Sequence, residues 1–351
     1  MATFFRVCHI NVARGYRGGE RQTELLIREL VNRRVGQALV ARQGEPLVQR
    51  LADLDLDIRE VSGNPLVVAA ASGGTDLLHV HEGRSVYSAY LRSLLVKTPY
   101  IITRRVNNPI GDHHWAHRAY RRAAYVAAVA PQVAEIVGAF DPEINVTVVH
   151  SGSSGFVVDE AKVDAIKRRF AGKYIVGHVG ALDNAQKGQV YLIEAARALR
   201  RTHPDLHFLL VGGGDDEAML RALAADLDNL TFEGFVENVG DYLAAMDLFV
   251  LPSNREGIGS ILFDAMERHL PIIATRVGGV PDIVHDGENG ILIEPARSDR
   301  LRDAIVAMCS DPARARELGA RGAEVAKRYT ASAMCDKYLE LYRETLGWKA
   351  G

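Results

Sequence analysis

Two carboxylates lie eight positions apart after a short apolar run, at Glu256 and Asp264. Gly257 and Gly259 stand between them and precede a helical pattern that starts near Ser260. Glycines before a helix N-terminus let backbone N–H groups approach a ligand closely, and the helix dipole favours an anion there. Carboxylates at these positions cannot bind phosphate, but they can accept hydrogen bonds from sugar hydroxyls. Taken singly, Glu256 is compatible with a surface loop and Asp264 with a simple helix-start preference. The pair in this context favours a ligand site.

A second loop, residues 180–188, also precedes a helix and contains Gly180 and Lys187 followed by Gly188. A lysine at a helix entry can hold a diphosphate as a point charge. A lone Lys-Gly pair is weakly specific, since most such lysines are solvated. This pair gains weight because it follows the first predicted strand of the second half, where doubly wound sheets bind ligands.

The corresponding turn near the N-terminus contains Gly18 and Gly19. It matches neither the dinucleotide fingerprint nor the phosphate-loop motif. One interpretation is a flexible connection, and the other is a loop whose backbone approaches a substrate.

His79 and His81 end another predicted strand, so their side chains point the same way. A zinc site would need a third ligand that the sequence does not indicate, so we expect no metal. We interpret His79 as a core residue and His81 as the candidate for the ligand site.

Residues 84–122 contain eight basic side chains and one acid, Asp112. The ordinary interpretation is a solvated helical face. The functional interpretation is a surface for an anionic acceptor or an anionic membrane, with Arg104 and Arg105 as the candidate acceptor contacts.

Composition narrows the class of protein. A chain of 351 residues fits two α/β domains, and a net charge of −2 does not indicate nucleic-acid binding. The three cysteines form no CxxC pair, which favours the cytoplasm. Residues 1–15 are expected to begin a β-strand and not a signal peptide. The longest uncharged apolar runs are too short to span a membrane.

Short apolar runs alternate with helical patterns, which indicates two parallel sheets covered on both faces by helices. Each half opens with strand, glycine loop and helix, so we predict two Rossmann-like, doubly wound domains with a boundary between His150 and Lys173, a segment that contains the Gly/Ser-rich residues 151–155 as the hinge candidate. We assign residues 1–160 to the first domain, 161–330 to the second and 331–351 to a C-terminal helical segment. The predicted strands are 4–11, 38–42, 77–80, 100–103, 125–129, 146–150, 174–180, 207–211, 230–232, 248–251, 272–274 and 290–293.

With these motifs assembled, the chain resembles the family-4 retaining glycosyltransferases of group 1, which have the GT-B fold of two domains facing across a cleft. The resemblance implies that Glu256 holds the donor sugar, Asp264 the ribose and Lys187 the diphosphate, with His81 beside the reacting centre. The terminal helix would cross back to the first domain. Further donor contacts implied by the resemblance are Gly18, Gly19, Gly180, Gly212, Phe235, Val236, Gly257, Ile258, Gly259 and Ser260.

The chain departs from the family pattern at two positions. Asp264 replaces the usual Glu, which keeps the charge but shortens the reach. Ala181 stands where the family usually has a diphosphate-binding Arg. Either another cation such as Arg255, Arg276 or an Arg of the first domain substitutes, or diphosphate binding is weaker, or the protein lacks full activity. We favour substitution.

The resemblance implies a retaining transfer of sugar from a nucleoside diphosphate to a glycan or lipid-linked acceptor, by front-face attack and without a metal or other cofactor. Synthesis of bacterial envelope polysaccharide or lipopolysaccharide is the expected setting, in the cytoplasm or at the inner face of the cell membrane. Alternatives are a GT-B-type sugar-nucleotide epimerase, a nicotinamide-dependent dehydrogenase and a non-catalytic nucleotide-sugar-binding protein. Donor, acceptor, linkage and oligomeric state are left open.

Overall fold

A computed structural model describes residues 5–348 of the chain. These residues form two compact units. The first contains the chain up to Gly152 together with the segment from Thr330, and the second is Ser153–Tyr329. The sequence-based boundary was placed eight residues further along. The start of the predicted strand 4–11 and the end of the predicted segment 331–351 lie outside the described residues.

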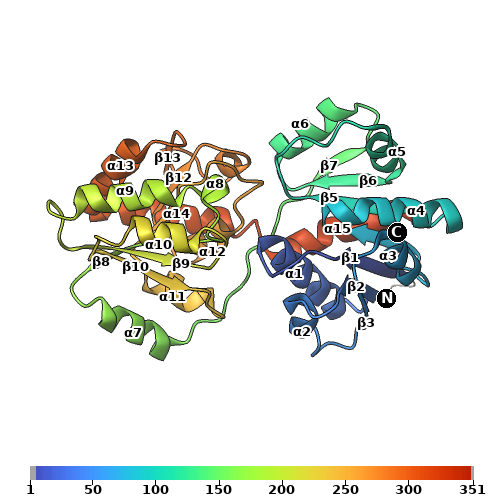
Figure 1. Ribbon diagram of the computed structural model, residues 1–351, viewed down its shortest axis with the longest axis horizontal. Helices are drawn as coiled ribbons and strands as arrows, with labels where there is room; N and C mark the ends of the chain where they lie inside the picture. The colour runs from blue at the N-terminus through green and yellow to red at the C-terminus, as the bar shows by residue number, and fades with distance from the viewer. Residues whose placement is uncertain (1–4, 349–351) are drawn as a thin grey trace. The chain divides into compact units, whose positions relative to one another are not determined.

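The first unit is built on a seven-stranded, fully parallel sheet (Figure 1). Its strand order is β3-β2-β1-β4-β5-β6-β7, so the order reverses direction between β1 and β4. His9 on β1 lies opposite His79 on β4. The strands are β1 (Arg6–Asn11), β2 (Gly36–Arg42), β3 (Asp57–Val61), β4 (Leu77–Val80), β5 (Tyr100–Arg104), β6 (Tyr125–Ala128) and β7 (Val146–Val148).

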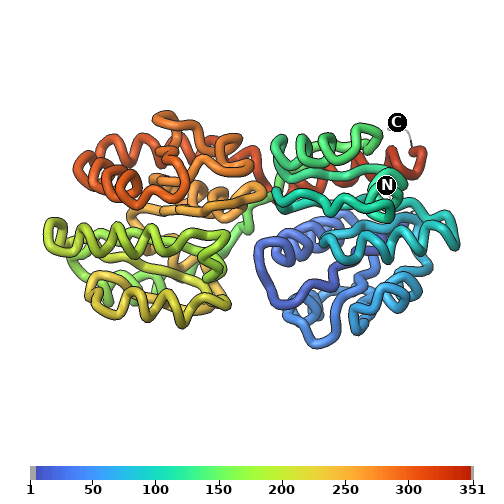
Figure 2. Tube along the Cα trace, turned by 45° about the horizontal axis from the view of Figure 1, so that its top comes forward, coloured from blue at the N-terminus to red at the C-terminus, as the bar shows by residue number. Residues whose placement is uncertain are grey.

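Helices cover both faces of this sheet, as alternation of strand and helix predicts (Figure 1). The last one, α15, comes from the end of the chain, and its red trace lies among the blue-to-green segments of the first unit in both views (Figures 1 and 2). The helices are α1 (Gly18–Asn32), α2 (Pro46–Arg50), α3 (Pro65–Ala71), η1 (Gly83–Ser85), α4 (Val86–Val96), α5 (His114–Arg122), α6 (Pro131–Phe140) and α15 (Ala331–Thr345).

Strand β3 was missed by the sequence analysis. It lies at the edge of the sheet and pairs with β2 alone. Its sequence, DIREV, has only one fully buried side chain, Val61. An edge strand with charged residues lacks the apolar run by which buried parallel strands are recognised.

The second unit repeats the plan with six parallel strands in the order β10-β9-β8-β11-β12-β13. The order reverses between β8 and β11, the counterparts of β1 and β4. The strands are β8 (Tyr174–Val179), β9 (Leu206–Val211), β10 (Leu230–Gly234), β11 (Leu248–Leu251), β12 (Ile272–Thr275) and β13 (Ile291–Ile293).

The predicted loop 183–188 contains a short helix, α8, which Asp183 caps by accepting a hydrogen bond from the Gln186 amide. Gly188 ends it with a φ of 64° and leads directly into α9. The helices of this unit are α7 (Glu160–Arg169), α8 (Asn184–Lys187), α9 (Gln189–Leu199), α10 (Glu217–Leu223), α11 (Val239–Ala245), α12 (Ile261–Glu267), η2 (Val280–Asp282), α13 (Ser298–Ser310) and α14 (Pro312–Ala326).

Each unit has its own hydrophobic core. In the first, the C-terminal helix contributes Tyr338 and Tyr342 to a cluster with Leu26 and Ile101. In the second, side chains of β8, β9 and β11 pack against α9 and α13. Within residues 5–348, no helix is both long and apolar enough to cross a membrane.

Candidate functional site

The predicted site residues of the second unit gather at the carboxyl ends of β8 and β11, where its strand order reverses. Doubly wound sheets bind ligands at this place, because neighbouring loops diverge there. Gly180 directly follows β8, and Pro252 directly follows β11. The two loops are joined by hydrogen bonds from the amides of Asn254 and Arg255 to the Gln186 carbonyl.

Lys187 and Glu256, 69 residues apart, form an ion pair across these loops. The Lys187 Nζ donates to Glu256 Oε1 at 2.5 Å, and the Ser253 hydroxyl donates to the same oxygen at 2.7 Å. Glu256 is only 5% exposed. A buried carboxylate is stable when it is paired and hydrogen-bonded, as here. The structure thus brings together the two residues that carried the sequence-based prediction.

Tight backbone packing fixes this pair. A Cβ on Gly278, whose φ is 56°, would lie 1.8 Å from the Glu256 carbonyl oxygen. A Cβ on Gly212 would lie 2.0 Å from the Gly180 oxygen, and one on Gly188 2.4 Å from the Pro252 oxygen. Real Cβ atoms do not approach backbone so closely, so each position requires glycine. Gly212, predicted as a donor contact, therefore holds the loop after β8 against that after β9.

Two buried polar residues beneath this loop were missed by the sequence analysis. His178 Nδ1 donates to the Val250 carbonyl at 3.0 Å, and Gln189 Nε2 donates to the Ala181 carbonyl at 2.8 Å. The Gln189 amide also lies 3.4 Å from His178 Nε2. Burial lowers the pKa of His178 to about 4, so the ring is neutral. The sequence did contain a signal for His178, since a histidine inside the otherwise apolar strand β8 indicates a buried polar side chain.

Asp264 lies inside α12 and is only 5% exposed. Its Oδ1 accepts a hydrogen bond from the Ser154 amide, so it fastens α12 to the start of the unit. Whether it contacts a ribose stays a prediction. Gly257 and Ile258 are also buried, and Gly259 has a φ of 71°. Ser260 is the residue before α12, as predicted from the helical pattern.

Phe235 and Val236 follow β10 at the same edge of the sheet. Phe235 is 66% exposed, which is unusual for an aromatic side chain, and its Cβ lies near Gly213. Val236 is half-buried. An exposed aromatic face beside the ligand loops can stack on a planar ring.

Arg255 and Arg276 were the two cations of this unit proposed to replace the missing Arg at position 181. Arg276 already lies 3.5 Å from Glu294 and 3.6 Å from Asp286. Arg255 is exposed and adjoins Glu256 in sequence. Of the two cations proposed from the second half, Arg255 is therefore the better placed.

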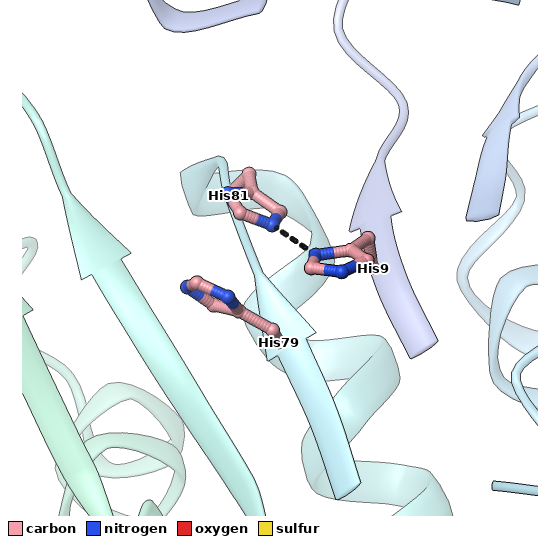
Figure 3. A group of neighbouring side chains, drawn as sticks. All are labelled: His9, His79 and His81. Atoms are coloured by element: carbon pink, nitrogen blue, oxygen red, sulfur yellow. Dashed lines mark hydrogen bonds between the residues drawn. The ribbon is translucent and has the colours of Figure 1, made fainter. Parts of the chain in front are cut away.

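In the first unit, the carboxyl ends of β1 and β4 hold a buried polar cluster. Gly18 and Gly19 are the first residues of α1, which follows β1. His81 follows β4 and is 3% exposed. Its Nε2 lies 2.9 Å from Nδ1 of His9, the contact dashed in Figure 3, and its Nδ1 lies 3.4 Å from Nη2 of Arg105.

His79 is a core residue, as the sequence analysis proposed. Its Nδ1 contacts the Tyr342 hydroxyl at 2.6 Å and its Nε2 the Thr103 hydroxyl at 2.7 Å. One ring nitrogen from each of His9, His79 and His81 lies within 4.8 Å of the others (Figure 3). Because the ring nitrogens already have hydrogen-bond partners, a metal would have to displace these contacts. Burial holds the pKa of His79 and of His81 well below 6.5.

The basic stretch 84–122 does not form one solvated face. Arg104 is buried and donates to the Asn108 carbonyl. Arg121 pairs with Asp141 and Glu143, and Arg122 with Ser93. An acceptor role for Arg104 would require its buried guanidinium to become accessible, whereas Arg105 lies beside His81 and Gly19. The acceptor prediction thus rests mainly on Arg105.

Comparison with solved structures assigns the fold class. The chain superposes on Alr3699/HepE of Anabaena in complex with UDP-glucose with a TM-score of 0.84 and 18% identity, covering 97% of this chain and 100% of that one. The two doubly wound units have the GT-B fold.

Sequence comparison shows similarity to glycosyltransferases, most specifically in the second unit. Residues 173–311 match the family of glycosyl transferases group 1. The chain is 28% identical to an alpha-D-kanosaminyltransferase of Streptomyces kanamyceticus over 76% of its length and 77% of that protein. It is also 28% identical to the lipopolysaccharide core biosynthesis glycosyltransferase LpsE of Rhizobium meliloti, over 66% of its length and 68% of that protein. Residues 173–311 thus match the group 1 glycosyl transferases, and the chain as a whole is similar to glycosyltransferases over about two thirds or more of its length.

Proposed function

We propose that the chain transfers a sugar, with retention of configuration, from a nucleoside-diphosphate sugar to a glycan or lipid-linked acceptor. The observation that carries this proposal is the Lys187–Glu256 pair at the carboxyl edge of the second sheet. One member suits the diphosphate and the other the sugar hydroxyls. UDP-glucose bound to the structurally similar Alr3699/HepE supports this donor class.

In the proposed reaction, the bond between the anomeric carbon and the diphosphate oxygen breaks as the acceptor oxygen bonds to the same face of the sugar. The acceptor proton passes to the departing phosphate. Lys187 stabilises the charge that develops on the leaving group, together with the amides before α12. Glu256, fixed by Ser253, accepts hydrogen bonds from the sugar and orients it. No metal or organic cofactor is required in this scheme.

The ion pair also suggests how the donor is received. Lys187 Nζ now donates to Glu256, and the Lys187 side chain is 17% exposed. An arriving diphosphate offers the ammonium further oxygen partners, while a sugar hydroxyl can donate to Glu256. Each residue thereby exchanges part of its present contact for one with the donor.

The test is a thermal-shift panel of UDP, GDP, ADP and CMP sugars, followed by transfer assays with the stabilising donor. A ligand at 100 times its Kd raises stability by about 2.7 kcal/mol. NMR of the product then gives the anomeric configuration. An inverted product would refute retention. A donor that binds but is never transferred to any hydroxyl acceptor would favour the non-catalytic alternative.

We further propose that the acceptor is anionic or lipid-linked and that the chain acts in the cytoplasm at the membrane face, in envelope polysaccharide or lipopolysaccharide synthesis. The name of LpsE supports this setting. So does the end of α4, where Leu94, Leu95 and Val96 are 49%, 81% and 52% exposed and Lys97 follows. Exposed apolar side chains beside a cation suit an anionic bilayer surface.

Sedimentation with anionic vesicles tests the membrane proposal. Binding should occur at low salt, weaken at high salt and fall when Leu95 is replaced by Asp. Leu223→Asp, at another exposed leucine, serves as the control. Equal recovery with and without vesicles would remove the membrane component while leaving the donor proposal intact.

A further inference from the structure

A chain of buried polar side chains runs through the first unit from α1 to the end of β5. It starts at the Ile27 carbonyl in α1, passes through Gln37 on β2 and His9 on β1, and reaches His81. The exposed fractions of Gln37, His9 and His81 are 7%, 0% and 3%. The successive contacts measure 3.2, 3.0 and 2.9 Å. Polar groups this deeply buried usually persist because they are hydrogen-bonded.

The direction of every hydrogen bond follows from its fixed end. A backbone carbonyl only accepts, so the Gln37 amide must donate Nε2–H to Ile27 and turn Oε1 toward His9. His9 then donates from Nε2 and accepts at Nδ1. His81 must therefore donate from Nε2, which leaves its own Nδ1 as an acceptor. If the Gln37 amide were flipped, its Oε1 would face the Ile27 carbonyl oxygen, and neither oxygen could donate a hydrogen bond.

The acceptor nitrogen of His81 faces a cation. Arg105 Nη2 lies 3.4 Å from His81 Nδ1. The Nε and Nη1 atoms of Arg105 are shielded from solvent and have no hydrogen-bond partner among residues 5–348. Buried N–H groups of a guanidinium are costly to leave unpaired. The Arg105 side chain also passes close to Gly19, at the amino end of the 15-residue helix α1.

We propose that Gln37 and His9 are positioning residues: they fix the tautomer of His81 so that it holds Arg105 as the cation of an oxyanion subsite beside Gly19. The unpaired Nε–H and Nη1–H would donate to the oxyanion, as the amino end of α1 favours. The subsite rests on the contacts of the first unit. Only the identification of the oxyanion as a substrate phosphate or carboxylate rests on the proposed function.

Neutral rings are essential to this arrangement. A protonated His81 would carry hydrogens on both nitrogens and would repel Arg105. Burial lowers the pKa of His9 to about 3, and burial together with neighbouring positive charge lowers that of His81 well below 6.5. The acceptor character of His81 therefore persists throughout the neutral pH range.

Imidazole nitrogen NMR of the full-length protein tests the tautomers directly. We expect His9 and His81 to be neutral, with hydrogen on Nε2 and an unprotonated Nδ1. This measurement needs no substitution in the chain, apart from single-histidine variants for assignment. An Nδ1–H tautomer of His81, or a protonated ring at neutral pH, would overturn the proposal.

Inorganic phosphate serves as the probe of the subsite. Its addition should shift the Nε–H signal of Arg105, and Gln37→Leu should weaken phosphate binding about tenfold, the effect of losing one oriented hydrogen bond. Gln37→Leu should also change the His81 tautomer signal. Asn229→Leu is the matched control, because Asn229 is an equally buried amide that donates to a backbone carbonyl of the second unit. Equal phosphate affinity in all three proteins would refute the positioning role.

Titration with UDP separates this proposal from the proposed function. A shift of the Arg105 signal by UDP would identify the donor diphosphate as the oxyanion, whereas a response to phosphate without one to UDP would assign the subsite to an oxyanion other than the donor diphosphate; either supports the subsite. If neither phosphate nor UDP shifted the Arg105 signal, the proposed oxyanion subsite would be refuted. The proposed function fails separately, if no sugar nucleotide stabilises the chain.

Discussion

The two sheets carry their candidate ligand residues at corresponding edges, but the cations at these edges have different partners. In the second unit, the cation Lys187 is paired with the carboxylate Glu256. In the first, Arg105 lies against a neutral histidine, and its Nε and Nη1 atoms have no hydrogen-bond partner among the described residues. The glycines differ as well. A Cβ on Gly278 would collide with backbone, whereas one on Gly19 would meet only the Arg105 side chain at 3.7 Å.

This difference separates two ways of preparing a binding site. The second unit has a rigid, charge-balanced site in which loop backbones hold one another. The first has a cation, Arg105, that interacts with the Glu20 carboxylate but has nitrogen atoms without a hydrogen-bond partner among the described residues, and open backbone lies beside it. A ligand can supply the missing partners. Preorganised charge lowers reaction barriers, while an unsatisfied buried donor gains most from an incoming acceptor.

Removing Lys187 should have the largest effect. Loss of one preorganised contact to a departing charge costs about 3–4 kcal/mol in the transition state, so Lys187→Ala should reduce turnover about 100- to 1,000-fold. Steady-state assays with the identified donor measure this, with Lys327→Ala, at an exposed surface pair, as control. Near-normal turnover of Lys187→Ala would remove the assigned role.

Replacing Gly278 by Ala tests the rigidity of the second site. The left-handed backbone costs an alanine about 1–2 kcal/mol, and overpacking against Glu256 adds about 1–3 kcal/mol. Gly287 also has a positive φ, 72°, but open space around it, so Gly287→Ala should show only the backbone cost. Denaturant unfolding of both variants gives the difference. Equal losses would mean that the loop around Glu256 can relax.

Acid should destabilise the first unit before the second. The first contains three fully enclosed histidines with lowered pKa, His9, His79 and His81, whereas the second contains one, His178, and a less deeply buried one, His207. Below about pH 6.5 these histidine side chains bind protons in the unfolded chain, whereas in the folded protein they stay neutral because their pKa values are lower. Stability therefore falls with decreasing pH by up to about 1.4 kcal/mol per unit for each ring, until the folded pKa is reached.

The two tryptophans provide the readout, because Trp115 and Trp348 both belong to the first unit. During acid titration their fluorescence should change before far-UV circular dichroism, which reports on both units. Coincident transitions would show that buried histidines do not govern the order of unfolding.

Gly19→Ala should have the smallest effect on stability. The position lies in the first turn of α1, and the added methyl group meets Arg105 at an ordinary contact distance. Alanine is favoured over glycine in helices by up to about 1 kcal/mol. Thermal unfolding should be unchanged or slightly raised. A fall in transfer activity without loss of stability would indicate that a ligand approaches the bare backbone, whereas unchanged activity would argue against close approach.

The sequence predicted buried features better than exposed or long-range ones. Strands β4 and β11 were predicted at their observed bounds, since continuous apolar runs mark buried parallel strands. The charged edge strand β3 was not predicted, because most of its side chains are only partly buried and form no apolar run. Lys187 and Glu256 were selected by their place after predicted strands, but their direct contact depends on loop packing that no local pattern encodes. The hydrogen-bonded link from Gln37 through His9 to His81 was not predicted, because it joins side chains from three separate segments of the chain.

The return of α15 to the first unit has a consequence for biosynthesis. The first unit lacks Tyr338 and Tyr342, which hold Thr103 and His79, until the final segment of the chain has been made. The second unit, Ser153–Tyr329, is continuous and is complete before that segment emerges from the ribosome. Domains generally fold from the N-terminus onward during synthesis, but here the first unit cannot complete its core until α15 has been synthesised. Until Tyr338 and Tyr342 have been synthesised, the apolar residues of the first unit that pack against α15 lack that cover.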